Sequence, residues 1–169
     1  MADHSDAHLK SLEQKTLAEI NAHLYKNLLL GIISIFVLAS ILMWGLHGIV
    51  DEKGLVIWYS AVLTVLLFRL FLLIWFHKKN HRLDLQNYLY GLFILFSTLS
   101  AIAFGVIGSF LMPADAIHQT LVIIIICGLI AGAVSSLGVS FLGGTLYVIF
   151  ALSPTMIWLG IQVYNGNQA

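Results

Sequence analysis

The residue best placed to do chemistry is a single arginine inside an apolar run. Arg69 lies in the run of residues 55–76, eight residues before His77, which in a helix is an axial distance of about 12 Å. A charge at that depth in a bilayer costs roughly 2.5–3.5 kcal/mol on insertion scales. No acidic residue lies in any apolar run, so its partner would be a carbonyl, a hydroxyl, a lipid phosphate or a ligand. Arg69 is therefore a candidate for anion binding or helix coupling, and the simpler alternative is structural pairing or snorkelling.

Three further polar residues stand beside the ends of apolar runs, namely His47, Asp115 and His118. By type they match zinc or copper ligands, and they would also suit a proton or a small ligand. Because they come from separate segments, only the fold could bring them together. We take them as candidates for ligand or proton sensing, against the simpler interpretation of polar groups at the water interface. We predict no metal site and no cofactor.

A stripe of small residues recurs every four positions in the apolar run 117–138 and just beyond it. Its members are Gly128, Gly132, Ser136 and Ser140. Such spacing predicts a face that another helix backbone can approach closely. One interpretation is close packing within the bundle. The alternative, a functional one, is that this face changes its packing during signalling or dimerisation. Gly105 and Gly108 are expected to supply part of the opposing surface.

Pro154 lies inside the last apolar run, after Ser153. A proline removes one helical hydrogen bond and usually kinks the helix. Kinks can act as hinges, although proline in membrane helices also serves packing alone. We include Pro154 among the candidates for helix coupling.

The elements that position these residues follow from composition. Hydrophobic residues make up 60% of the 169 and charged residues only 9%, whereas soluble domains are about 45–50% apolar and about 25% charged. The excess apolar surface must face lipid. The formal net charge is zero, so nucleic acid is not an expected partner. The single Cys127 excludes an intrachain disulfide.

Five apolar runs are each near the roughly 20 residues that a helix needs to cross a bilayer. They cover approximately residues 28–49, 55–76, 88–112, 117–138 and 144–164. Backbone groups in lipid must pair within their own segment, which favours helices over strands. We therefore predict an all-α integral membrane protein, a bundle of about five transmembrane helices. The weakest break is the uncharged stretch from Gly138 to Gly144, a tight turn or a re-entrant bend.

The first 26 residues are polar, and residues 8–26 have a loose helical pattern of apolar positions. We predict a short amphipathic helix there, followed by a transmembrane domain over residues 27–169. Orientation follows from the basic residues in the short flanks, six on the N-terminal side and one, Lys53, on the other. The positive-inside rule then places the N-terminus in the cytoplasm and Ala169 outside.

At these residues the sequence resembles a family, the membrane-associated sensor domains at the N-termini of bacterial sensor histidine kinases and diguanylate cyclases. The resemblance covers roughly residues 20–164. It is carried by LYKN (Leu24–Asn27), Arg69, the basic stretch 77–82, a Gly-rich third span, HQ (His118–Gln119), G-x-x-AGA-x-S (Gly128–Ser135), Phe150 and Pro154. Relatives often have Trp-Gly where this chain has Phe104-Gly105. They usually also have a sixth span that leads back to a cytoplasmic kinase or cyclase.

The resemblance implies a sensory input domain in the bacterial inner membrane, truncated before its last span and output domain. It would bind a small-molecule or lipid ligand in the bilayer, form a homodimer, and pass helix displacement to the missing module. The chain itself is not expected to be an enzyme, because no P-loop, G-x-S-x-G or H-E-x-x-H motif is present. Two alternatives stay open: a small transporter or channel component, and a membrane scaffold or assembly subunit.

Overall fold

The computed structural model describes residues 2–79, 86–137 and 140–166, and within them all regular structure is helical. The helices are α1 (Ala2–Leu46), α2 (Glu52–Lys79), α3 (Gln86–Ile107), α4 (Ala116–Leu137) and α5 (Phe141–Gly166). This confirms the predicted helical class. The expected break from Gly138 to Gly144 lies in part outside the described residues, which omit 138–139, and α5 already begins at Phe141. His81 and Arg82 of the basic stretch also lie outside the described residues.

Each of the five helices contains a stretch long and apolar enough to cross a membrane. The stretches are Tyr25–Leu46, Glu52–Trp75, Asn87–Ile107, Ala116–Ser135 and Phe141–Gly166, within about five residues of the predicted bounds. Large apolar side chains cover the outside of the bundle, among them Trp44, Phe110 and Phe141. A surface of this kind suits lipid and not water. The protein thus has the features of a multi-pass membrane protein.

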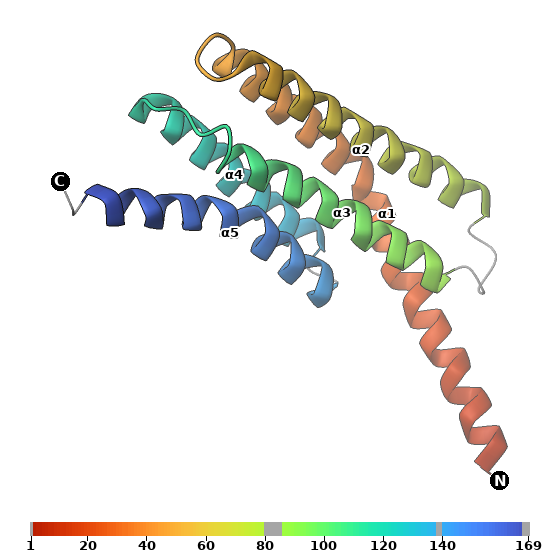
Figure 1. The fold of residues 1–169 in the computed structure, drawn as a ribbon. Coiled ribbons are helices and arrows are strands. Elements are labelled where there is room, and N and C mark those ends of the chain that lie inside the picture. The colour runs from red at the N-terminus through yellow and green to blue at the C-terminus, as the bar shows by residue number, and fades with distance from the viewer. Residues whose placement is uncertain (1, 80–85, 138–139, 167–169) are drawn as a thin grey trace.

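The predicted amphipathic segment and the first span form one helix. α1 runs without interruption for 45 residues from Ala2 to Leu46, so the expected boundary at residue 26 is not a break in structure. The sequence there offers no proline or glycine before Gly31 that would interrupt the helix. Figure 1 shows the first half of α1 leaving the bundle and projecting away from the other helices.

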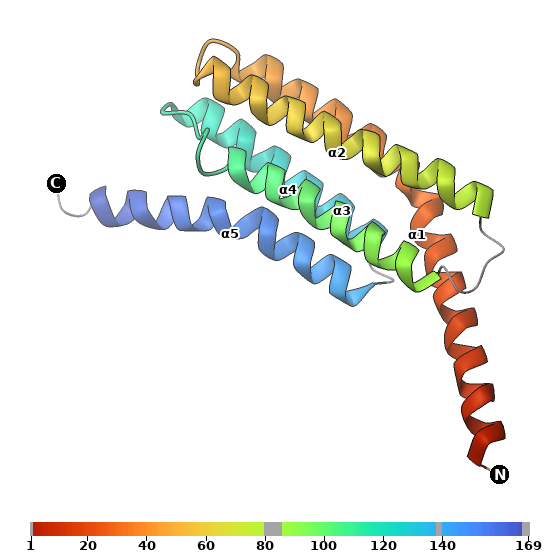
Figure 2. The ribbon, with the colours of Figure 1, turned by 45° about the vertical axis from the view of Figure 1, so that its right-hand side comes forward.

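The helices alternate in direction, and α3 packs against all four of the others. α1 also packs against α2 and α4, and α5 packs against α4 (Figures 1 and 2). The bundle has two ends. The Asn27 end holds the start of α3 and the end of α4, and the Pro113 end holds the α1–α2 turn and the loop before α4.

Three helices begin with the same local device, an N-cap side chain that accepts a backbone N–H three residues later. The pairs are Asp51 with Gly54 at 2.6 Å, Asp115 with His118 at 3.1 Å, and Ser140 with Gly143 at 3.1 Å. Each satisfies a donor that the first turn leaves without an intrahelical acceptor. Gly48, with a φ of 76°, follows the end of α1 in the left-handed conformation that glycine favours there. These residues fix where the spans begin and end.

Two apolar clusters hold the bundle together, one toward each end. The cluster at the Pro113 end is centred on Leu42, Trp58 and Phe104, and the indole of Trp58 donates to the Ala103 carbonyl at 2.6 Å. The cluster at the Asn27 end is centred on Tyr25, Leu89, Phe93 and Tyr147. The Tyr25 hydroxyl donates to the Leu89 carbonyl at 3.3 Å. These hydrogen bonds tie α2 and α1 to the central α3.

Candidate functional site

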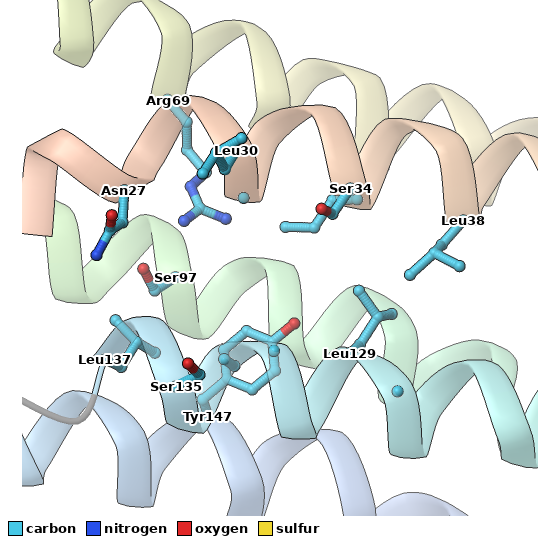
Figure 3. Close-up of a pocket in the computed structure, with 15 residues that line it drawn as sticks. Asn27, Leu30, Ser34, Leu38, Arg69, Ser97, Leu129, Ser135, Leu137 and Tyr147 are labelled. Atoms are coloured by element: carbon cyan, nitrogen blue, oxygen red, sulfur yellow. The ribbon is translucent and has the colours of Figure 1, made fainter.

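A cavity of about 440 Å³ lies within the bundle, toward its Asn27 end, and every helix contributes to its walls. α1 forms one wall from Asn27 to Leu38, and α4 forms another from Gly128 to Leu137. α2, α3 and α5 each add one side chain, and these are Arg69, Ser97 and Tyr147 (Figure 3). The volume falls in the range of sites that bind small molecules, about 300–1,000 Å³.

Arg69 brings a buried charge to this cavity. Its side chain is only 7% exposed, and the one hydrogen bond it makes within the described residues is from Nη1 to Ser100 Oγ at a long 3.4 Å. A guanidinium has five N–H donors and is charged at every accessible pH. Figure 3 shows the group aimed into the cavity, on the side where Asn27 and Ser97 lie. Most of its hydrogen-bonding capacity therefore faces the empty space.

Ser97 is a second buried polar group at the cavity wall. It is 1% exposed, and its Oγ has no hydrogen-bond partner in the described structure. Its neighbours Thr98 and Ser100 donate to the carbonyls of Ile94 and Phe96, one turn earlier in α3. Ser97 does not make this local bond. Buried hydroxyls without partners are rare in native structures, and each calls for an explanation, such as a bound water or ion.

The cavity is more polar at one end than at the other. In Figure 3 Asn27, Arg69, Ser97 and Ser135 lie toward one end, the polar end, together with Leu30 and Leu137. Ser34 lies further along, and Leu38 and Leu129 lie at the other end, the apolar end. The ring of Tyr147 lies between the two groups. The lining thus changes in polarity along its length, which suits a molecule that is itself polar at one end.

The cavity opens sideways, between α1 and α4. Leu30, Ser34 and Gly132 line it and are also exposed on the outside of the bundle, as are Gly128 and Ser135. A Cβ added to Gly128 or Gly132 would meet nothing within 4 Å. The expected close approach of another helix along this stripe is therefore wrong for these two glycines in the single chain, because α4 packs through larger residues such as Val122 and Ile126. The side chain of Ser136 lies outside the described set.

Gly105 and Gly108 face α5 and not the small residues of α4. A Cβ on Gly105 would lie 2.5 Å from the Phe150 carbonyl oxygen and 2.9 Å from Cγ of Pro154. A Cβ on Gly108 would overlap Oγ1 of Thr155. The expectation that these glycines oppose the stripe on α4 is wrong, since the closest helix packing in this region joins α3 to α5.

Pro154 lies at this contact and inside α5. Because proline has no N–H, the Phe150 carbonyl lacks its helical donor, and that carbonyl is directed at the close contact with Gly105. Figures 1 and 2 show α5 bending along its course. The kink expected from the sequence is thus accompanied by a neighbouring glycine that makes room for it.

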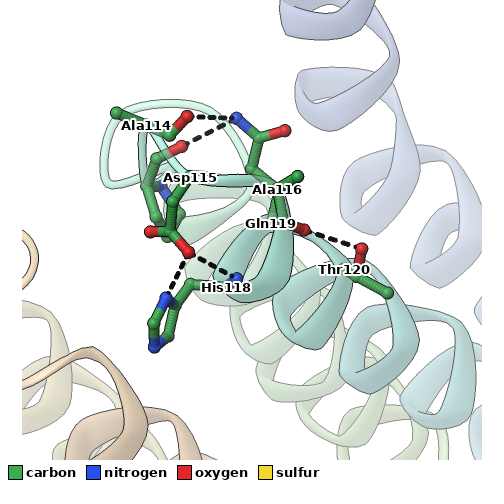
Figure 4. Close-up of polar contacts among 7 residues, drawn as sticks. Ala114, Asp115, Ala116, His118, Gln119 and Thr120 are labelled. Atoms are coloured by element: carbon green, nitrogen blue, oxygen red, sulfur yellow. Dashed lines mark hydrogen bonds and ion pairs between the residues drawn. The ribbon is translucent and has the colours of Figure 1, made fainter.

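The three candidates for sensing do not form one site. Asp115 and His118 pair closely, with His118 Nδ1 2.5 Å from Asp115 Oδ2 (Figure 4). His47 instead lies 4.0 Å from Glu52. No group of three histidine, cysteine or acidic side chains suited to a metal occurs in the described ranges. The structure therefore does not gather His47, Asp115 and His118 into one site. Each of these polar groups is engaged locally beside its own helix end, as the simpler interpretation holds.

The Asp115–His118 pair closes the first turn of α4. Hydrogen bonds from the His118 side chain and backbone N–H lower the pKa of Asp115 below its ordinary value. Next in the chain, the Gln119 amide donates to the carbonyls of Pro113 at 2.9 Å and Ala114 at 3.3 Å (Figure 4). Both residues of the HQ motif thus hold the loop before α4 in place. In the structure their role is to fix a helix end.

Sequence reasoning found Arg69 but did not single out the other polar groups of the cavity. Ser97 and Tyr147 come from the third and fifth spans, and Asn27 appears only within the LYKN motif. Each is a hydrogen-bonding side chain within or beside an apolar run, which is a signal that could have been used. Comparisons with protein families, curated proteins and solved structures find no match to this chain.

Proposed function

We propose that this chain is the sensory input domain of a bacterial signal-transduction protein, in the inner membrane with its N-terminus in the cytoplasm. The observation that supports this best is a cavity to which all five helices contribute and into which Arg69 is directed, with one long hydrogen bond among the described residues. A ligand bound there contacts every helix. Its binding free energy can therefore favour one packing of the bundle over another.

α1 offers a route from the cavity to a signalling module. The helix lines the cavity between Asn27 and Leu38 and continues without a break to Ala2. The part before Ile20, from Ala2 to Glu19, has 18 residues, about 27 Å of helix, and it projects from the bundle (Figure 1). Shifts of about 1–2 Å in one helix are an established way to carry a signal. We propose that such a shift reaches a kinase or cyclase module, as the family resemblance implies.

The packing at the other end of the bundle supports sensing over transport. Between the cavity and the Pro113 end, the interior is filled by apolar side chains, including Leu42, Trp58, Phe104 and Ile126. A channel or carrier needs a polar path that can open to both sides. The described interior offers a polar end of the cavity on one side and a largely apolar core on the other, which suits a site that binds a ligand and holds it.

A distance measurement tests the proposal without knowledge of the ligand. Spin labels are placed on cysteines at Glu19 of α1 and Asn87 of α3, both exposed, in the full chain with Cys127→Ser, in phosphatidylcholine nanodiscs. Gly132→Leu fills the cavity wall where added atoms meet nothing. It is expected to shift the label distance by about 1–2 Å.

The matched control is Gly160→Leu, since Gly160 is also an exposed helical glycine with nothing within 4 Å of an added Cβ. It lies in α5, away from the cavity lining, and should leave the distance unchanged. The proposal fails if the two variants give the same distance as the parent, because α1 would then be insensitive to the cavity.

A further inference from the structure

We infer that the cavity binds an anionic amphiphile, a molecule with a carboxylate or phosphate head and an apolar chain, which reaches it sideways from the bilayer between α1 and α4. The inference deepens the proposed function, since it names the ligand class of the same cavity. It rests on three observations: the buried cation and its partners, the apolar end, and the lateral opening.

The polar end of the cavity is built for an anion. Arg69 is nearly fully buried, makes a single long hydrogen bond within the described residues, and has no acidic residue beside it in the lining of the cavity. Its remaining N–H groups form the planar fork that binds carboxylate and phosphate oxygens in pairs. Ser97 adds a buried hydroxyl with no partner. An anionic head would satisfy both groups at once and neutralise a charge that is costly in this location.

The remainder of the cavity requires an apolar chain on that head. Leu38 and Leu129 lie at the end away from Arg69 (Figure 3). A small inorganic anion would leave these side chains facing empty space. A chain of methylene groups would cover these side chains and fill the space beside them. The change of polarity along the cavity therefore matches a head and a tail.

The opening lies where such a molecule would arrive. Leu30 is 67% exposed and lines the cavity, and Gly31, Gly128 and Gly132 beside it have no atom within 4 Å of an added Cβ. The missing side chains leave a gap between α1 and α4 at the level of the apolar spans. A lipid-soluble ligand can pass this gap with its chain still in hydrocarbon, whereas a free ion would have to leave water.

Binding of tritiated palmitate to the full chain tests the inference. The protein is reconstituted in phosphatidylcholine nanodiscs, and bound label is followed by scintillation proximity. We expect saturable binding that is competed by unlabelled palmitate and by phosphatidic acid, but weakly by hexadecanol, acetate or inorganic phosphate. If palmitate competes better than phosphatidic acid, the head is a free carboxylate. If phosphatidic acid competes better, the ligand is a membrane phospholipid with the same head chemistry.

Variants tie the binding to the cavity. Arg69→Gln should weaken palmitate binding by about tenfold or more, as expected for the loss of charged hydrogen bonds, and Arg69→Lys should retain part of it. Lys53→Gln is the matched control, because Lys53 is an exposed cation at the Pro113 end. Gly132→Leu should also reduce palmitate binding, because it fills the opening. Since this variant keeps Arg69, it tests the cavity even if Arg69→Gln does not fold.

The inference is overturned if hexadecanol competes as well as palmitate, if acetate or phosphate does so, or if neither cavity variant changes the affinity. Its failure can be told apart from failure of the proposed function. Should palmitate and phosphatidic acid not bind while Gly132→Leu still shifts α1, sensing stands and this ligand class falls.

Discussion

Two regions of the bundle use glycine in opposite ways. Between α3 and α5, Gly105 and Gly108 allow backbone and side chains of α5 to approach so closely that no Cβ would fit. Between α1 and α4, Gly128 and Gly132 leave space that no described part of the chain fills. The first pair of glycines makes a contact, and the second pair makes an opening. A small residue in a membrane helix therefore does not by itself indicate helix packing.

Buried hydroxyls repeat the contrast. Thr155 Oγ1 in the α3–α5 contact and Ser97 Oγ at the cavity both lack a hydrogen-bond partner in the described structure. Thr155 is surrounded by close packing against Gly108, so there is no room for a ligand to reach it. Ser97 faces a cavity large enough for one. A buried hydroxyl without a partner is thus a cost of packing in the α3–α5 contact, whereas at the cavity we propose that it is available to bind a ligand.

The largest expected effect separates the two kinds of glycine. Gly105→Ala places a Cβ against a backbone carbonyl and the Pro154 ring, which cannot move aside cheaply, and should lower the free energy of unfolding by about 2–3 kcal/mol. Gly132→Ala adds a methyl group to open space and should be neutral or stabilising by up to about 1 kcal/mol. Unfolding in mixed micelles, followed by tryptophan fluorescence, measures both. If both variants lost the same free energy of unfolding, the two pairs of glycines would not differ in the way described.

Arg69 gives the next effect, in the stabilising direction. Without a ligand its buried charge has one weak hydrogen bond, so Arg69→Leu should raise the free energy of unfolding by about 1–2 kcal/mol, as replacement of buried ionic groups often does. Lys53→Leu, at an exposed position, serves as control and should change it little. A loss of stability in Arg69→Leu would mean that the arginine serves packing in the empty state, contrary to a binding role.

The two hydroxyls can be compared directly. Thr155→Ala and Ser97→Ala each remove a buried oxygen without a partner, and each should stabilise the empty protein by up to about 1 kcal/mol. Only Ser97→Ala should weaken palmitate binding, by a few-fold. Thr155→Ala should also reduce the cost of Gly108→Ala, since the added Cβ would no longer overlap Oγ1. A change in palmitate binding by Thr155→Ala would show that the two regions are coupled.

The sequence predicted the helices well because that information is local. The apolar runs determine the spans. The starts of α2, α4 and α5 are determined by Asp51, Asp115 and Ser140, whose side chains each accept the backbone N–H three residues later. Contacts between helices were not predictable in this way. Gly105 could face α4 or α5, and only the arrangement of the helices around α3 decides for α5.

The candidate site was predictable only in part for the same reason. Arg69 stands out because a charge is rare in an apolar run. Ser97 and Tyr147 gain significance only from lying beside Arg69, which depends on α2, α3 and α5 meeting at one level. The sequence left His47, Asp115 and His118 as candidates for sensing, against the simpler interpretation of polar groups at the water interface. The local contacts of His47 with Glu52 and of Asp115 with His118 agree with the simpler interpretation.

The smallest expected effect concerns the loop end of α4, which belongs to neither region. The lowered pKa of Asp115 means that its folded carboxyl releases its proton more readily than the unfolded one, near 3.9. The cap is therefore fully present at neutral pH and is lost as the pH falls through the folded pKa, below 3.9. The carbon-13 shift of the Asp115 carboxyl should show a midpoint under that value, and Asp115→Ala should raise hydrogen exchange at the His118 amide.

Palmitate binding at neutral pH should be unaffected in Asp115→Ala, since the cavity begins at Gly128, more than three turns further along α4. Asp115→Asn is the matched control, because it removes the titration while keeping an N-cap oxygen, and His118 should stay protected in it. A midpoint at or above 3.9 would contradict the prediction, because it would mean that the contacts with His118 do not stabilise the charged form of Asp115. Loss of palmitate binding in Asp115→Ala would instead show that α4 responds as one rigid element. The capped start of α4 and its cavity-lining part from Gly128 onward would then change conformation together.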